Sequence, residues 1–131
     1  MRPVLFIFFL SLTVTFAVVY TIHWYITKAD RVLPPEGTYI RQSQHEFGNE
    51  WDTLSISPQK SVAAEYLITR QWHYERLLDG EAVQPEYKIS ISSAFWNAKE
   101  NTLEELDGSV YTVDPTGKQL FNGKIIYLKI K

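Results

Sequence analysis

The chain has 131 residues, a formal net charge of −2 and no cysteine. This length allows one small domain beside a targeting segment, and the mildly acidic balance lacks the basic footprint that nucleic-acid binding needs. Without cysteine, disulfides, thiolate metal sites and thiol catalysis are excluded. The 4 Trp, 8 Tyr and 7 Phe provide large side chains with which a small domain can build a core without cross-links.

The first element is an uncharged apolar run from Val4 to Ile26, which contains no Asp, Glu, Lys or Arg. As a helix it would be about 35 Å long, enough to cross a hydrocarbon core of about 30 Å. Its few polar residues are mostly hydroxyls, which can bond back to the helix backbone within lipid. The sequence therefore predicts a transmembrane anchor or signal-anchor over residues 1–27.

Two fates of this segment are considered. Small residues at Thr15 and Ala17 resemble a signal-peptidase site. However, cleavage after Ala17 would leave an apolar mature terminus that begins VVYTIHWYI. In addition, Tyr20, Trp24 and Tyr25 lie near the distal end of the run, where aromatic side chains meet lipid headgroups. These features favour a retained anchor with a membrane interface at the three aromatic residues; a cleaved signal is the alternative.

The flanking charges are nearly balanced, with Arg2 before the run and Lys28 and Arg31 after it. An N-terminal segment that precedes a much longer domain usually directs that domain across the membrane. We therefore predict a single-pass membrane protein whose C-terminal domain is extracytoplasmic, in the periplasm or at the cell surface. Residues 28–35 form a tether that Pro34-Pro35 stiffens.

Residues 36–131 are dense in β signals. Asp79-Gly80, Asp107-Gly108 and Asn122-Gly123 are typical of two-residue hairpin turns, and DPTGK at 114–118 is a proline-initiated turn that glycine closes. The intervening segments alternate with a period of two residues, and no helical period is sustained after the anchor. The predicted fold is all-β: a small antiparallel up-and-down β-barrel of about eight strands, preceded by one N-terminal transmembrane helix.

The longest predicted strand carries the main functional hypothesis. Tyr66, Ile68, Arg70, Trp72 and Tyr74 share one face of it. If this face is interior, Arg70 needs an acidic partner or an anionic ligand. We therefore name Arg70, Tyr66, Trp72 and Tyr74 as candidate ligand-binding residues. The alternatives are that a bulge brings Arg70 to the surface or that it stacks on Trp72 outside the barrel.

EGTY at 36–39, with a glycine two residues before an aromatic residue, opens the first predicted strand, and GKIIYLKI at 123–130 is the closing strand. In this spacing the chain resembles the small lipocalin-like (calycin-like) β-barrel proteins of bacterial envelopes, over about residues 36–131. Lipocalins characteristically have Trp where this chain has Tyr39. The resemblance implies a cup-shaped barrel that sometimes holds an apolar ligand.

Other motifs do not support catalysis. The acidic and histidine residues of QHEFGNEWD, residues 44–52, lack an established metal-ligand spacing and are predicted to form a solvated hairpin loop. SPQK at 57–60 lacks the partner motifs of serine enzymes. Glu104 and Glu105 point to opposite faces of a predicted edge strand. We predict no catalytic residue, no metal, no cofactor and no enzymatic activity.

Two functions are consistent with these features. In the first, a membrane-tethered lipocalin-like barrel binds a small apolar or amphipathic ligand or presents an interaction surface. In the second, a non-enzymatic accessory subunit of a cell-envelope assembly has a barrel filled with side chains and binds an envelope protein. Inward Tyr and Trp favour a filled barrel, whereas inward Ser, Gly and Ala favour a cavity. The alternation does not say which face of each strand is inward.

Overall fold

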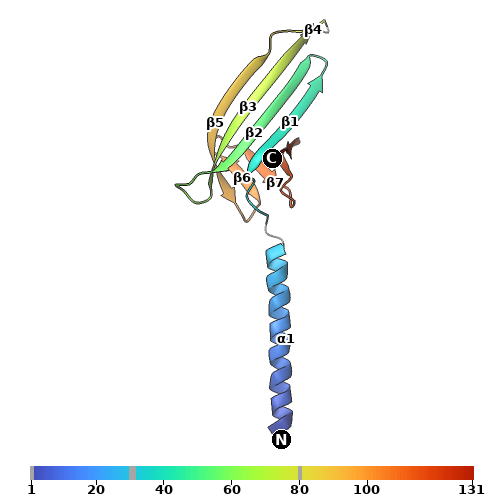
Figure 1. The fold of residues 1–131 in the computed structure, drawn as a ribbon, viewed down its shortest axis with the longest axis vertical. Helices are drawn as coiled ribbons and strands as arrows, with labels where there is room; N and C mark the ends of the chain where they lie inside the picture. Colours follow the sequence, from blue (N-terminus) through green and yellow to red (C-terminus); the bar gives the residue numbers. More distant parts are fainter. Residues whose placement is uncertain (1, 30–31, 80) are drawn as a thin grey trace. The chain divides into compact units, whose positions relative to one another are not determined.

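The computed structural model describes residues 2–29, 32–79 and 81–131 (Figure 1). Backbone contacts divide the chain into two compact units, Met1–Arg31 and Val32–Lys131. The first unit contains one helix, and the second contains all of the described strands.

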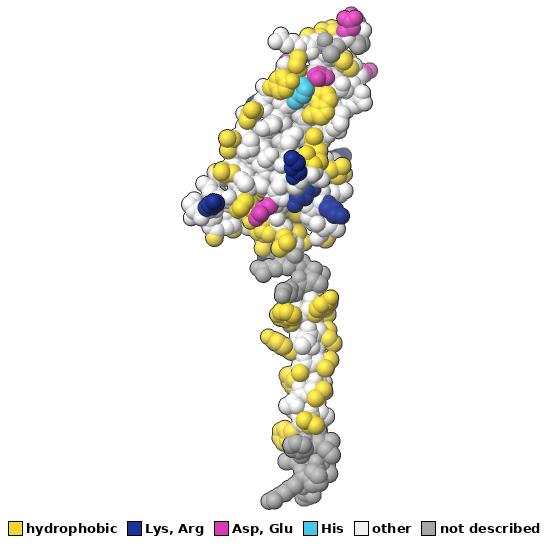
Figure 2. All heavy atoms as spheres, in the orientation of Figure 1, with side chains coloured by type: hydrophobic (Ala, Val, Ile, Leu, Met, Phe, Trp, Pro, Cys, Tyr) yellow, Lys and Arg dark blue, Asp and Glu magenta, His cyan; other side chains and the backbone are white. Residues whose placement is uncertain are grey.

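The helix of the first unit, α1, extends over Arg2–Ala29. Its segment Phe9–Ile26 has a mean hydropathy of 1.5 and is long and apolar enough to cross a membrane. Figure 2 shows hydrophobic side chains along the described part of the helix and none coloured as charged. The hydroxyls of Thr13, Thr15 and Thr21 donate to backbone carbonyls three or four residues earlier, which confirms the expected bonding back to the helix.

The second unit is a closed antiparallel β-barrel of eight strands, as the sequence predicts. Consecutive strands pair in an up-and-down order, and the last strand closes the barrel by pairing Lys129 and Leu128 with Tyr39 and Ile40 of the first. A ninth, two-residue strand, β4, pairs only with β3. The strands are β1 (Gly37–His45), β2 (Gly48–Pro58), β3 (Glu65–Leu78), β4 (Glu81–Ala82), β5 (Glu86–Asn97), β6 (Thr102–Glu105), β7 (Val110–Val113), β8 (Gln119–Asn122) and β9 (Ile125–Lys129).

The strands differ greatly in length, and this shapes the domain. β5 pairs with β6 only over its last four residues, Ala94–Asn97, and β1 pairs with β9 over two residues only. β1, β2, β3 and β5 therefore continue beyond the short strands as an open four-stranded sheet (Figure 1). We call this part, residues 41–45, 48–53, 70–78 and 86–92, the sheet extension.

The closed part of the barrel is filled with side chains. Its core contains four tyrosines, and each fully buried large apolar side chain contributes roughly 1.5–3 kcal/mol by leaving water. The core residues are Tyr39, Leu54, Ile56, Tyr66, Ile68, Ala94, Leu103, Tyr111, Val113, Leu120 and Tyr127. By the criterion of inward tyrosines, the barrel interior is packed and is not an apolar cup.

On two strands the more apolar face points outward. In β5, Tyr87, Ile89 and Ile91 are 70%, 68% and 68% exposed. In β9, Tyr127 is buried, whereas its neighbours on the opposite face, among them Leu128, are exposed. Core packing on adjacent strands fixes these faces, because a one-residue change of register would reverse every side chain.

Two predicted hairpins are present, but their turn residues differ from the predicted pairs. Asn122 pairs with Ile125, so the hairpin loop is Gly123-Lys124, and of these two only Gly123 has a positive φ, of 58°. Gly108 adopts a φ of 92° after a turn in which its N–H donates to the carbonyl of Glu105 at 3.0 Å. In each case glycine takes the left-handed conformation and the preceding Asn or Asp does not.

The other two predicted turns have different outcomes. Asp79 has a positive φ of 52°, whereas Gly80 lies outside the described residues. At 114–118 the predicted turn is confirmed: the N–H of Gly117, with a φ of 69°, donates to the carbonyl of Asp114 at 2.9 Å.

Candidate functional site

The candidate site residues lie on the inward face of β3. The register places Arg70 opposite Leu54 and Ile68 opposite Ile56, and both of these β2 residues are buried in the core. Alternation then puts Tyr66, Arg70, Trp72 and Tyr74 on the same inward face. Tyr66 is enclosed in the packed core, whereas Arg70, Trp72 and Tyr74 continue from the core onto the sheet extension.

Arg70 has an acidic partner within the chain. Its Nε lies 2.9 Å and 3.1 Å from the two carboxylate oxygens of Asp52, and its Nη2 donates to the same carboxylate. Asp52 is completely buried and also accepts a hydrogen bond of 2.8 Å from the hydroxyl of Tyr127. The hydrogen bond to Asp52 raises the pKa of Arg70, and burial followed by the same carboxylate raises the pKa of Tyr127.

A second carboxylate lies at the same end of the core. Glu105 accepts hydrogen bonds from the hydroxyl of Ser92 and, at 3.1 Å, from that of Tyr111. Burial, and then the charge of Glu105, raise the pKa of Tyr111. The rings of Tyr111 and Tyr127 meet edge to face with centroids 6.2 Å apart. Because each of these tyrosines donates a hydrogen bond to one of the two carboxylates, the four side chains form one connected layer. This layer separates the packed core from the open end.

An open pocket of about 300 Å³ lies beyond this layer, lined by Arg70, Trp72, Lys88 and Ser90. The register brings these together, because Arg70 pairs with Ser90 and Trp72 with Lys88. Trp72 is held by a hydrogen bond of 2.9 Å from its Nε1 to Glu50. Among the described residues Lys88 has no salt bridge. A cation without a carboxylate partner therefore stands beside an oriented aromatic ring.

The aromatic surface continues away from the pocket. The rings of Trp72 and Tyr74 stack with centroids 5.7 Å apart, and His45 stacks on Tyr74 at 6.1 Å. The row runs along the inward face of the sheet extension. A positive pocket at one end of an aromatic row can hold a molecule that has an anionic group attached to an apolar part.

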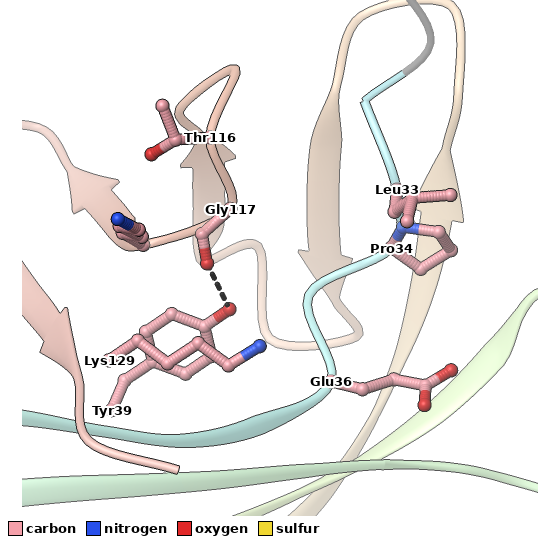
Figure 3. Close-up of a pocket in the computed structure, with 8 residues that line it drawn as sticks. Leu33, Pro34, Glu36, Tyr39, Thr116, Gly117 and Lys129 are labelled. Carbon is pink, nitrogen blue, oxygen red and sulfur yellow. Dashed lines mark hydrogen bonds between the residues drawn. The ribbon is translucent and has the colours of Figure 1, made fainter.

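A second pocket lies where the chain enters the barrel and includes Leu33, Pro34 and Glu36 in its lining (Figure 3). Figure 3 shows the hydroxyl of Tyr39 donating to the carbonyl of Gly117, at 3.1 Å. Burial, and then the nearby Asp114, raise the pKa of Tyr39 to about 12. The tyrosine hydroxyl is thus already bonded within the protein, and the wall combines lysines with a carboxylate, so this pocket selects no ligand charge.

Sequence reasoning placed Asp52 wrongly. The segment 44–52 is not a solvated loop: β2 begins at Gly48, and Asp52 lies inside the barrel. The signal that could have located it is its spacing of two and four residues from Leu54 and Ile56, which share its face. Lys88 and Ser90 were also missed, because only the strand pairing brings them to Arg70 and Trp72.

Two further expectations concern acidic residues. Glu105 is not on an edge strand, because β6 pairs with both β5 and β7. In the described part of the chain, no group of three or more His, Cys, Asp or Glu side chains could hold a metal ion.

The predicted membrane-interface residues lie on α1. Tyr20, Trp24 and Tyr25 are 70%, 53% and 73% exposed near the C-terminal end of that helix. Their positions in α1 are consistent with an aromatic belt at one end of an apolar span.

Comparison of the chain with protein-family models, with curated proteins and with solved structures gives no match.

Proposed function

We propose that this chain is a membrane-tethered, extracytoplasmic, lipocalin-like β-barrel that binds a small amphipathic anion at the open end of the barrel. The observation that carries the proposal is the pocket in which Lys88, without a carboxylate partner among the described residues, stands beside Arg70 and Trp72. The protein acts by binding and not by catalysis.

The packed core determines where such a ligand binds. Tyr39, Tyr66, Tyr111 and Tyr127 occupy the barrel interior, so an acyl chain has no room between them. The anionic group would instead contact Lys88 and the exposed part of Arg70, whose side chain is 44% exposed. The apolar part would lie along the aromatic row on the inward face of the sheet extension.

In this proposal α1 stays in the membrane and anchors the domain. The apolar span Phe9–Ile26 supports this role, and the exposed aromatic residues Tyr20, Trp24 and Tyr25 would mark its extracytoplasmic interface. Tethering would keep the domain at a membrane, which is a source of amphipathic anions.

The test is a titration of a fluorescent fatty-acid analogue against the full chain in lipid nanodiscs, with empty nanodiscs as the baseline. We expect saturable binding that weakens at least tenfold, or about 1.4 kcal/mol, in Lys88→Gln. Lys99→Gln removes an exposed lysine in a distant turn and should bind as the parent does. The uncharged methyl ester should bind less tightly. Absence of saturable binding by the parent would reject the proposal.

The packed interior also favours a second candidate, the accessory subunit of a cell-envelope assembly. Here the pocket at Lys88 would receive an acidic side chain of a partner protein. A photo-crosslinking residue at position 88 distinguishes the two functions in intact cells. A defined adduct with a protein other than this chain, together with no saturable binding of the fatty-acid analogue, would support the accessory subunit.

A further inference from the structure

The edge of β5 in the sheet extension is unpaired. β5 pairs with β3 from Glu86 to Phe95 but with β6 only from Ala94 onward. The N–H of Trp96 donates to Ala64 on the β3 side, and the carbonyl of Ser93 accepts a bond from Leu106 on the opposite side. Because the backbone groups of a strand alternate in direction, those of odd-numbered residues face away from β3.

The open edge therefore consists of the N–H and C=O groups of Tyr87, Ile89 and Ile91. No hydrogen bond to these groups from the free side occurs within the described residues. Their side chains are also the most exposed apolar ones of the strand, at 70%, 68% and 68%. Figure 2 shows a row of hydrophobic side chains along the margin where Figure 1 places β5.

Natural proteins usually protect such an edge. Common devices are a proline, a charged side chain, a very short strand or a covering element. The unpaired part of β5, residues 86–92, contains no proline, and its charged residues, Glu86 and Lys88, lie on the face opposite to Tyr87, Ile89 and Ile91. An edge of this length, with apolar side chains on one face, is a template for pairing with another strand.

We propose that two copies of this chain pair antiparallel through their β5 edges, with Ile89 on the two-fold axis. In this register Ile89 faces Ile89 of the second copy, and Tyr87 faces Ile91. All three residue pairs present their backbone groups to each other, so each pair exchanges two N–H···O bonds. The same register brings the exposed apolar side chains together as cross-strand pairs.

The charges on the other face fit the same register. Lys88 lies opposite Ser90 of the second copy, and Glu86 lies opposite Ser92, so no like charges are directly opposed. Since Lys88 and Ser90 line the open pocket, the two pockets would lie on neighbouring strands across the axis. The dimer does not depend on ligand binding, and either proposal can fail without the other.

A free edge on β1 fits less well. The backbone groups of Thr38 bond to Ile130 and Lys131 on the β9 side, so by alternation those of Gln42 and Gln44 face the free edge. This edge is shorter and polar. Pairing β5 with β1 of the next copy would be heterologous and would produce open-ended assemblies, whereas the β5 pairing closes as a dimer.

Cross-linking tests the register directly, because the chain has no cysteine. Directly opposite residues that exchange hydrogen bonds have Cα atoms about 5.5 Å apart, within disulfide range. In oxidised membranes that contain the full chain, we expect a disulfide-linked dimer of Ile89→Cys. Tyr87→Cys and Ile91→Cys are equally exposed controls and should each cross-link at least tenfold less. Co-expressed, these two should form the mixed dimer.

The outcomes are distinct. Equal cross-linking at all three positions, or none at position 89, overturns the proposal. A disulfide between Ile89→Cys and a different protein, with no dimer of the chain, also overturns it and identifies a partner strand instead.

Introducing opposite charges at position 89 provides a second test of the dimer. Ile89→Lys and Ile89→Glu change an exposed side chain, and each should retain the parent's circular dichroism and melting temperature. Each should lower the dimer affinity of the full chain in detergent at least tenfold by sedimentation, and an equimolar mixture should restore it. A dimer that survives both substitutions would place the contact elsewhere, for example on α1, and overturns the proposal.

Discussion

Arg70 and Asp52 form a bidentate ion pair at the level where the packed barrel core ends and the sheet extension begins. Asp52 is completely buried, whereas the side chain of Arg70 is 44% exposed. The ion pair with Arg70 and the hydrogen bond from Tyr127 therefore stabilise the charge of Asp52 in the interior. The same pair joins β2 to β3 beneath the open pocket.

The first prediction concerns this ion pair. Arg70→Met leaves Asp52 buried with the hydroxyl of Tyr127 as its remaining side-chain donor, and should lower the free energy of unfolding by about 3 kcal/mol. Asp52→Leu combined with Arg70→Met removes both charges and should recover a large part of this loss. The measurement is urea unfolding followed by tryptophan fluorescence. A single variant as stable as the parent would contradict the structural role of the pair.

The ion pair also shows how far the sequence alone could be interpreted. Alternation and turns predicted an antiparallel barrel of about eight strands, because each strand keeps a period of two whatever its environment. The sequence also indicated that an inward Arg70 requires an acidic partner or an anionic ligand. It did not identify Asp52, because a carboxylate in a polar segment looks solvated until the pairing of β2 with β3 is known.

The inward face could not be assigned for a related reason. On β5 the face that contains Ile89 is more apolar than the face that contains Ser90, yet the apolar face is exposed. Alternation in a sequence shows that one face of a strand is more apolar than the other. Packing against other strands decides which of the two faces is buried. If β5 pairs with a second copy, the exposed face gains the apolar contacts that its composition suggests.

The second prediction compares two glycines. From the sequence, Gly123 should be the more sensitive because it belongs to a tight turn, and Gly37 the more tolerant. The structure reverses this order. A Cβ on Gly37, whose φ is 119°, would lie 2.1 Å from the carbonyl oxygen of Lys131, whereas a Cβ on Gly123 meets nothing within 4 Å. We expect Gly123→Ala to cost about 1 kcal/mol and Gly37→Ala clearly more, measured by thermal unfolding. Equal losses would contradict the close approach at Gly37.

The third prediction is a pH dependence at the turn between β7 and β8. Partial burial raises the pKa of Asp114, but hydrogen bonds from Thr116 and Gln119 outweigh this and hold the pKa below its ordinary value. The contribution of Asp114 to stability is therefore complete above its ordinary pKa, near 4, and is lost as the pH falls through the lower folded-state pKa.

Asp114→Asn tests this linkage. The variant should be less stable than the parent by about 1 kcal/mol at pH 7. Between about pH 4 and pH 2 it should lose less stability than the parent, because it has no carboxylate to protonate. Unfolding midpoints across this range give both values. Parallel acid slopes for variant and parent would exclude a contribution from Asp114.

The fourth prediction is that the N-terminal segment stays on the mature protein. The apolar span continues past Ala17 to Ile26, and the part beyond Ala17 includes the exposed aromatic residues at the end of α1. We expect the protein in the membrane fraction, resistant to carbonate extraction, with an N-terminus before Val18. A soluble mature chain that begins at Val18 would show that the segment is a cleaved signal.

The fifth prediction is that residues 32–131, expressed alone, fold into the barrel. The division of the chain falls between Arg31 and Val32, and every buried residue of the core cluster belongs to the second unit. The strands close on themselves, so the barrel wall needs no hydrogen bond from α1. The fragment has 10 basic and 14 acidic residues, a net charge of −4 that favours solubility.

The fragment should give a β-type circular dichroism spectrum and one cooperative thermal transition. Burial raises the pKa of Tyr39 to about 12 and also raises the pKa of Tyr111 and of Tyr127. In the folded fragment these three hydroxyls therefore stay protonated above pH 10, where the tyrosines of an unfolded chain ionise. Its stability should therefore fall as the pH rises from about 10 toward 12. Absorbance at 295 nm would show delayed tyrosine ionisation in the native fragment. If all tyrosines ionised near pH 10 and no cooperative transition occurred, the isolated barrel would not be folded, and α1 would be required for its structure.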